Sequence, residues 1–334
     1  MPWEPRSQRG RHIHAPEERT QAQQRKELQQ GPFQDPQEEP SGSTRRLAPV
    51  TCYHPIPAYQ GTSGEELRLW PPVGTATHEL PCGSCIGCKT SRATDWARRA
   101  EHEASSWQDN CFLTLTYDEA HLPKGAQLEP NALQKFIKRL RTTRDNLHPD
   151  IRSDRTHGLR YLACGEYGER GGRPHYHMLL FNCDFANTYA IGETEKRSQL
   201  LQKLWPHGQH CLGTVTGASA NYVAQYTLKK QGSTYCDQDG VIKPAPFLRM
   251  SLKPAIGTRW IEKNKRDLTH GYLVTNGTKG RIPRTYKNKL RVIDPQRAEF
   301  SEWQASKQPH PRENLAAAEI IHTRRAQLGN NRKL

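Results

Sequence analysis

Apolar positions recur along the chain with two different periods, and these periods predict the order of its elements. A period near 3.6 residues predicts helices over residues 89–107 and 130–145. Alternation of apolar and polar residues, with many β-branched and aromatic side chains, predicts a strand over residues 111–123. Residues 159–182 have the pattern of two strands joined by a glycine-rich turn. This segment therefore predicts a β-hairpin in the middle of the chain.

Helices and strands continue to alternate after this hairpin. Residues 195–205 have the pattern of an amphipathic helix, and residues 213–230 that of a short strand followed by a helix. Strands joined by hairpins and interleaved with helices are typical of the α+β class. We therefore predict a central antiparallel sheet with helices packed on it, preceded by a small cysteine-rich metal-binding element.

The helix predicted at 130–145 has two contrasting faces. Its apolar face carries Leu133, Phe136, Ile137 and Leu140 at helical spacing. Its outer face is basic and carries Lys135, Lys138, Arg139, Arg141 and Arg144. A charged outer face is commonly only a solvated one, so this stripe alone does not assign a partner.

Composition and charge point to a polyanionic partner. Of the 334 residues only 34% are hydrophobic, and 49 Lys and Arg stand against 34 Asp and Glu, which gives a net charge of +15. Nucleic acid is the partner that such a charge indicates. No apolar run approaches the roughly 18 residues of a membrane span, so we expect no membrane partner and reduced thiols in a cytoplasm.

Changes in composition divide the chain into five segments. The first is rich in Gln, Glu, Arg and Pro and has few aliphatic residues, so we expect it to be disordered. The predicted segments are a polar arm (1–48), a cysteine-rich element with a helix (49–108), a core of strands and helices (109–235), a basic C-terminal extension (236–295) and a polar tail (296–334).

Cysteines are clustered near the start of the second segment. Cys82, Cys85 and Cys88 repeat at CxxCxxC spacing, and Cys52 lies upstream. Two-residue gaps allow thiolates to converge on one cation, and four thiolates suit tetrahedral zinc. His54 competes with Cys52 for the fourth position, and an iron–sulfur cluster is a weaker alternative.

The stretch RPHYHMLLF places two imidazoles on one face of a strand. His175 and His177 share that face because side chains alternate along a strand. If the hairpin is symmetric about its turn, Glu166 lies across from His175 and Cys164 across from His177. Two imidazoles and a carboxylate make a plausible site for a divalent metal. Glu169 is a competing carboxylate, but it falls in the turn.

The stretch NYVAQYTLKK predicts a helix with two tyrosines on one face. Tyr222 and Tyr226 are four residues apart, and Lys229 extends their stripe. A phenol becomes a useful nucleophile when a cation activates its target or a neighbour favours the phenolate. The alternative is that both tyrosines simply pack on the sheet.

The ordered set of motifs resembles the rolling-circle replication initiators of the HUH endonuclease superfamily. The resemblance is to those of small single-stranded DNA bacteriophages, the gokushovirus group of microviruses. It covers roughly residues 50 to 290 and rests on PCGSCIGC, DWARR, FLTLTYDEAHLP, CGEYGERGGRPHYHMLLF and YVAQYTLKK, in that order. LKPAIGTRW and GRIPRTY match weaker blocks further on.

The resemblance implies a role for each candidate residue. His175 and His177 match the metal ligands of the HUH motif, and Glu166 matches the carboxylate that completes such sites. The two-tyrosine motif makes Tyr222 and Tyr226 alternating nucleophiles and Lys229 a helper cation. The implied fold is the compact sheet and helices of the HUH nucleases, so residues 109–235 would be an endonuclease core that follows the zinc-binding element.

These observations lead to the expectation of a metal-dependent nickase and strand transferase. It would cut and rejoin single-stranded phage origin DNA through a 5′-phosphotyrosine intermediate, using Mg²⁺ or Mn²⁺. No GxxxxGKS or GxxxxGKT loop is present, so no ATP is expected. A host helicase and a host DNA polymerase would complete rolling-circle replication in the cytoplasm of the bacterial host.

Two other interpretations stay open. One keeps the chemistry in a plasmid replication initiator, a relaxase or a transposase. The other is a non-enzymatic, zinc-stabilised DNA-binding protein in which the histidines and tyrosines are structural. The second interpretation predicts that the hydroxyls of Tyr222 and Tyr226 lie far from His175 and His177.

Overall fold

The computed structural model describes residues 52–60, 67–69, 78–168, 172–191, 195–229, 234–236, 240–307 and 314–331. All of them belong to one unit of the chain, Arg46–Leu334. The predicted polar arm (1–48) and Glu169 lie outside the described residues. Among the residues described, no helix is long and apolar enough to cross a membrane.

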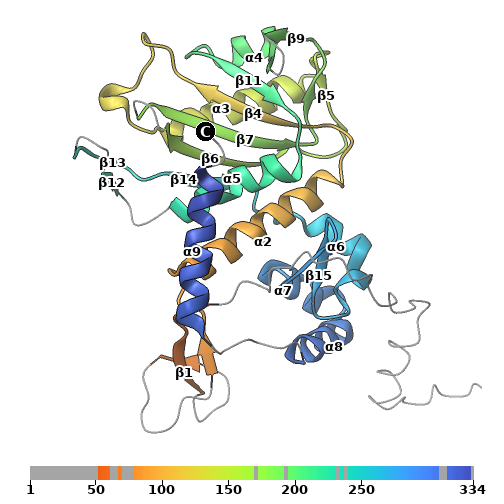
Figure 1. Cartoon of the computed structure of the whole chain (residues 1–334). Coiled ribbons are helices and arrows are strands. Elements are labelled where there is room, and N and C mark those ends of the chain that lie inside the picture. The colour runs from red at the N-terminus through yellow and green to blue at the C-terminus, as the bar shows by residue number, and fades with distance from the viewer. Residues whose placement is uncertain are drawn as a thin grey trace, which may run out of the picture. The chain divides into compact units, whose positions relative to one another are not determined.

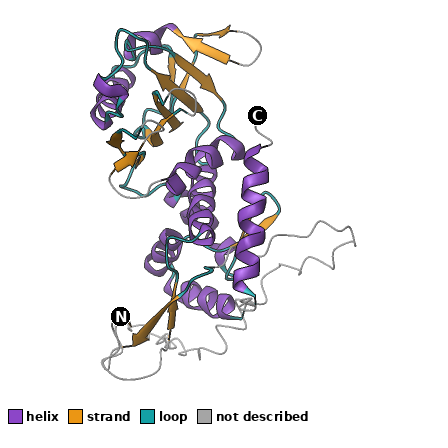
Figure 2. Ribbon diagram, turned by 60° about the vertical axis from the view of Figure 1, so that its left-hand side comes forward, coloured by secondary structure: helices purple, strands orange, loops and turns teal. Residues whose placement is uncertain are grey.

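A seven-stranded antiparallel sheet is the largest sheet of the described residues and lies in the upper part of Figure 1. Its strand order is β14-β6-β7-β4-β11-β10-β9. The strands are β4 (Asn110–Thr116), β6 (Arg160–Tyr167), β7 (Pro174–Phe181), β9 (Thr188–Ile191), β10 (Glu195–Ser198), β11 (His210–Gly213) and β14 (Phe247–Met250). Helices lie among these strands along the chain, so the prediction of an α+β fold is confirmed (Figure 2).

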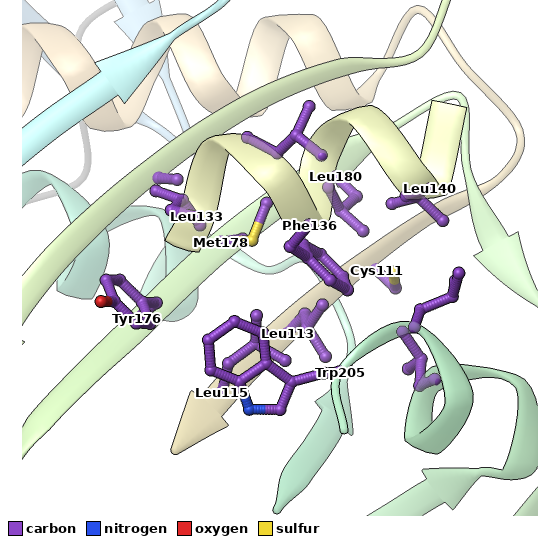
Figure 3. Close-up of a cluster of buried hydrophobic side chains, with 14 of the residues drawn as sticks. Cys111, Leu113, Leu115, Leu133, Phe136, Leu140, Tyr176, Met178, Leu180 and Trp205 are labelled. Carbon is purple, nitrogen blue, oxygen red and sulfur yellow. The ribbon is translucent and has the colours of Figure 1, made fainter. Parts of the chain in front are cut away.

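One face of the sheet is covered by α3 (Pro130–Asp145) and α4 (Gln199–Leu204). The apolar face of α3 was read correctly, because Leu133, Phe136, Ile137 and Leu140 are all buried there (Figure 3). They pack with sheet residues that point to the same side, among them Leu113 and Met178. Burial of a side chain of this kind contributes about 1.5–3 kcal/mol.

The opposite face of the sheet is covered by α5 (Gly217–Lys229). The helix α2 (Ile86–Ala104) packs against α5. Ala100 of α2 joins Ala220 and Val223 of α5 and Leu179 of β7 in one buried cluster. Ala93 and Ala97 pack on Ala224 in a second cluster. Small side chains along both helices allow their backbones to approach closely.

The C-terminal part of the chain builds a second apolar core. It consists of α6 (Thr258–Asn264), η2 (Lys265–Leu268), β15 (Leu273–Thr275), β16 (Thr278–Gly280), α7 (Arg284–Ile293) and α8 (Pro295–Ser306). Leu268, Tyr286 and Leu290 are buried in this core. It is joined to α2 through His102, which stacks on Trp260 with ring centroids 3.8 Å apart. β14 of the central sheet also lies within the residues assigned to the C-terminal extension.

The remaining elements are short, apart from the last helix. They are β1 (Ile56–Gln60), β2 (Leu67–Arg68), β3 (His78–Leu80), η1 (Lys124–Ala126), β5 (Ile151–Arg152), β8 (Asp184–Phe185), β12 (Thr234–Cys236), β13 (Ile242–Pro244) and α9 (Leu315–Asn331). β1 pairs with β2 and β3 beside the cysteine-rich segment.

Four local predictions were wrong. The strand expected over residues 111–123 ends at Thr116, and the strand expected from residue 213 is β11, which ends there. The helix expected over residues 195–205 begins as β10, because residues 195–198 pair with β9 and Lys196 also pairs with Leu212 of β11 before α4 starts. Arg144 does not belong to the solvated outer face of α3, since it is only 3% exposed. Its guanidinium donates hydrogen bonds to the hydroxyl of Ser153 and to the carbonyl of Asp154, and these bonds hold the loop that follows the helix.

Candidate active site on the α5 face of the sheet

The β6–β7 hairpin has the register that symmetry about its turn predicted. Glu166 pairs with His175, and Cys164 pairs with His177. Directly paired residues of an antiparallel ladder point to the same face. The two histidines and Glu166 therefore lie on the side of the sheet that α5 covers, and this part of the prediction is confirmed.

His177 is held by hydrogen bonds at both ring nitrogens. Its Nε2 lies 2.8 Å from Oε1 of Glu166, and its Nδ1 lies 3.0 Å from the hydroxyl of Thr114 on β4. Both His177 and Glu166 are buried. A buried carboxylate in contact with an imidazole is a strong, charge-assisted interaction, so the orientation of this pair is fixed.

His175 is half-buried, and its ring lies parallel to that of His177 with centroids 6.4 Å apart. Its Nδ1 donates to the carbonyl of Arg173 at 2.7 Å, which leaves Nε2 as the nitrogen able to bind a metal. Burial lowers the pKa of His175. A lowered pKa favours the neutral ring, which is the form that coordinates a metal. A Cβ at Gly168 would lie 2.8 Å from this ring, so a larger residue there would displace the imidazole.

Tyr222 brings a hydroxyl from α5 to this pair. Its Oη donates to Oε1 of Glu166 at 3.2 Å and lies 3.4 Å from Nε2 of His177. The rings of Tyr222 and His177 meet edge to face at 90°, with centroids 5.0 Å apart. The expectation of the non-enzymatic alternative, a hydroxyl far from the histidines, is therefore wrong for Tyr222.

Tyr226 and Lys229 lie on α5 four and seven residues after Tyr222. These spacings place all three Cα atoms on one side of the helix. The side chains of Tyr226 and Lys229 lie outside the described part of the chain. Their roles stay predictions.

Two imidazoles and a carboxylate are donors that could together bind a divalent metal ion. Ligands bound at about 2.1 Å and at right angles lie about 3.0 Å apart, close to the separation between His177 and Glu166. The ligand atoms of His175, His177 and Glu166 do not all lie within 4.8 Å of one another. Binding of one ion by all three would therefore require His175 to move closer to His177 and Glu166.

The four predicted cysteines form a tighter cluster than the two histidines and Glu166. The sulfurs of Cys52, Cys82, Cys85 and Cys88 all lie within 4.8 Å of one another. The Cys82 and Cys88 sulfurs are 3.9 Å apart, close to the roughly 3.8 Å that tetrahedral zinc with 2.3 Å bonds requires. The cluster could therefore bind a structural zinc ion.

Backbone N–H groups support these sulfurs. Cys82 N–H donates to the sulfur of Cys52 at 3.2 Å, and Cys85 N–H donates to the sulfur of Cys82 at 3.3 Å. The bond from Cys85 lowers the pKa of Cys82 to about 6, which favours its thiolate, whereas burial raises the pKa of Cys52 and Cys88. His54 does not compete for the cluster, because its Nε2 contacts Glu319 of α9 at 2.7 Å.

Two supporting contacts were not expected from the sequence. The hydroxyl of Thr114 orients His177, and the carbonyl of Arg173 orients His175. The first had a visible signal, because Thr114 is a polar residue between apolar ones in FLTLT and so belongs to the face that carries the site. The second is a backbone group and has no side-chain signal.

The candidate site of this chain is therefore a sheet that carries two histidines and a carboxylate beside a tyrosine from a helix, and the comparisons show the class of protein to which it belongs, a phage replication-associated protein. The family model of the replication-associated protein ORF2/G2P matches residues 110–231. The chain is 37% identical over 255 residues to the replication-associated protein VP4 of Bdellovibrio phage phiMH2K, covering 74% of this chain and 79% of that protein. The chain belongs to the family of microvirus replication-associated proteins.

Two further relatives have the same description. The replication-associated protein ORF2 of Spiroplasma virus 4 is 35% identical over 197 residues, which cover 56% of this chain and 58% of that protein. The replication-associated protein ORF4 of Chlamydia phage 1 is 30% identical over 231 residues, which cover 66% of this chain and 56% of that protein. The comparison with solved structures gave no match.

Proposed function

We propose that this protein is a phage replication initiator that nicks and rejoins single-stranded origin DNA through a tyrosine nucleophile. The observation that carries the proposal is the position of the Tyr222 hydroxyl, 3.2 Å from Glu166 and 3.4 Å from Nε2 of His177. A phenol has an ordinary pKa near 10 and needs such neighbours to react. Membership in a family of phage replication-associated proteins supports the biological setting.

In the cleavage step the Tyr222 oxygen attacks a scissile phosphorus in line with the departing 3′ oxygen. A new bond joins phosphorus to the tyrosine, the bond to the 3′ oxygen breaks, and the product is a 5′-phosphotyrosine. The phenol proton passes to the Glu166 carboxylate, which already accepts its hydrogen bond, and the 3′ oxygen takes a proton from water. No ATP is consumed, because the ester keeps the energy of the phosphodiester bond.

His175, His177 and Glu166 would hold Mg²⁺ or Mn²⁺, which supplies neutralisation of the charge that develops on the phosphate. Thr114 and the Arg173 carbonyl hold the two imidazoles in place through Nδ1. Lys229 would add a second positive charge on the same side of α5.

Tyr226 would act as the second nucleophile. After one round of replication it attacks the regenerated origin, and the new 3′-hydroxyl then attacks the first phosphotyrosine and closes the circle. The free 3′-hydroxyl made at the start primes a host polymerase, and a host helicase unwinds the duplex in the bacterial cytoplasm. The four cysteines would hold zinc as a structural ion.

The test is covalent capture of a labelled single-stranded library drawn from small phage genomes. The protein is incubated with the library in Mn²⁺ or in chelator, as wild type, Tyr222→Phe, Tyr226→Phe and the double variant. We expect an SDS-resistant, Mn²⁺-dependent adduct that disappears in the double variant. Tyr189→Phe is a matched control, because Tyr189 is 47% exposed on β9, at the far edge of the sheet.

Tight binding without an adduct under any metal would contradict the proposal. That result would leave a zinc-stabilised DNA-binding protein. A second library of plasmid origins and transposon ends is tested in parallel, and an adduct that forms only with that library would keep the chemistry and contradict the assignment to phage replication.

A further inference from the structure

A groove of about 390 Å³ lies along the outer surface of α3. It is lined by Lys135, Lys138, Arg139, Thr142, Thr143 and Leu204. The five polar residues come from one side of the helix, and Leu204 is the last residue of α4. α3 and α4 cover the face of the sheet opposite to α5 and Tyr222, so the groove is separate from the candidate active site.

The groove is positively charged and has no acidic residue in its lining. Lys135 and Lys138 are exposed, and no carboxylate of the described residues forms an ion pair with either. Arg139 differs from them because it is partly buried. Its Nε donates to the carbonyl of Leu204 at 3.1 Å, which fixes the plane of the guanidinium.

Nη2 of Arg139 is a buried donor without a hydrogen-bond partner among the residues that the structure describes. A buried donor without a partner is unfavourable, and a phosphate oxygen bound beside Arg139 would supply that partner. Arginine and lysine with nearby hydroxyls are the donors that bind phosphate oxygens. These donors span residues 135 to 142, or about 10 Å of helix, which is room for about three phosphates of a stacked strand.

We infer that this groove binds the sugar–phosphate backbone of a nucleic-acid strand at a second place on the protein. It would hold DNA independently of sequence and independently of the chemistry at Tyr222. Phosphate contacts of this kind position a strand and make its binding dependent on salt.

The test measures binding of an oligothymidine strand to the full chain over a series of salt concentrations. Lys135→Ala/Lys138→Ala is compared with Lys263→Ala/Arg266→Ala, which removes the same charge from two exposed residues of α6 and η2. Each lost phosphate contact reduces the slope of log K against log salt by about 0.7, so the groove variant should lose about 1.4. If the groove variant and the wild type bind equally at 1 M salt, this slope change makes the variant bind about 25-fold more weakly than the wild type at 0.1 M salt. Circular dichroism checks that both variants are folded.

Equal losses in the two variants would mean that only total charge matters, and that result would overturn the inference. No loss in the groove variant would overturn it as well. The groove variant is also tested with polyglutamate. If it loses as much affinity for polyglutamate as for oligothymidine, the groove binds acidic polymers in general, and the assignment to nucleic acid is overturned. A Tyr222→Phe protein should give the same binding result, so failure of the proposed chemistry and failure of the groove are distinguishable.

Discussion

Replacing Glu103 with Gln should destabilise the protein strongly, because three donors converge on this buried carboxylate. Glu103 is 0% exposed. Its Oε1 accepts from Arg160 of β6 and, at 3.1 Å, from Nε1 of Trp107, while Oε2 accepts from the Gly257 N–H at 2.6 Å. An amide at this position removes the charge that balances Arg160 and turns an NH₂ group toward at least one donor. Breaking a buried pair of this kind costs about 3–5 kcal/mol.

The assay is thermal unfolding followed by circular dichroism. For a chain of this size about 1 kcal/mol corresponds to about 2–4 °C, so Tm should fall by roughly 10 °C. Glu262→Gln is the matched control, because Glu262 pairs with Lys289 at the surface, where an ion pair contributes about 0–1 kcal/mol. Equal Tm values for the two variants would refute the reasoning that Glu103 joins α2, the sheet and the C-terminal core.

Three further predictions concern other parts of the structure. Thr114→Val should weaken Mn²⁺ binding by about 10- to 100-fold, because His177 loses the hydrogen-bond partner of its Nδ1. Isothermal titration calorimetry measures the affinity, and an unchanged affinity would count against an orienting role of Thr114. Burial lowers the pKa of His102 to about 4, so the unfolded chain takes up a proton from about pH 6.5 downward while the folded chain does not. Stability should therefore fall between about pH 6.5 and 4, by up to about 3 kcal/mol, and His102→Asn should flatten this slope in urea unfolding. Cys85→Ser should abolish the zinc content measured by mass spectrometry, whereas Cys236→Ser, at an exposed cysteine outside the cluster, should leave one ion per chain.

The register of the candidate site could be predicted from the sequence because the hairpin is local. Glu166 and His175 are nine residues apart, and a turn fixes which residues of its two strands face each other. The cysteine cluster was predictable for a similar reason, since three of its four ligands lie within seven residues. The choice of Cys52 over His54 was not, because it depends on Glu319 of the distant α9.

Other features depended on tertiary contacts that no local pattern encodes. The start of the predicted helix at 195–205 became a strand because β9 and β11 lie on both sides of it. The charge pattern of α3 did not distinguish Arg144, which is buried under the following loop, from Lys135 and Lys138, which are exposed. Propensity and period act within a few residues, and packing decides where they conflict.

α2 connects the parts of the molecule that the candidate chemistry needs. Its first turn contains Cys88, its N-cap is Cys85, and both belong to the cysteine cluster. Its middle packs through small side chains on α5, the helix that carries Tyr222. Its last turn holds Glu103, which binds the sheet and the C-terminal core. Because α2 is fixed at both ends and α5 rests on it, the position of the Tyr222 hydroxyl relative to the histidines depends on contacts that are far from the site in the sequence.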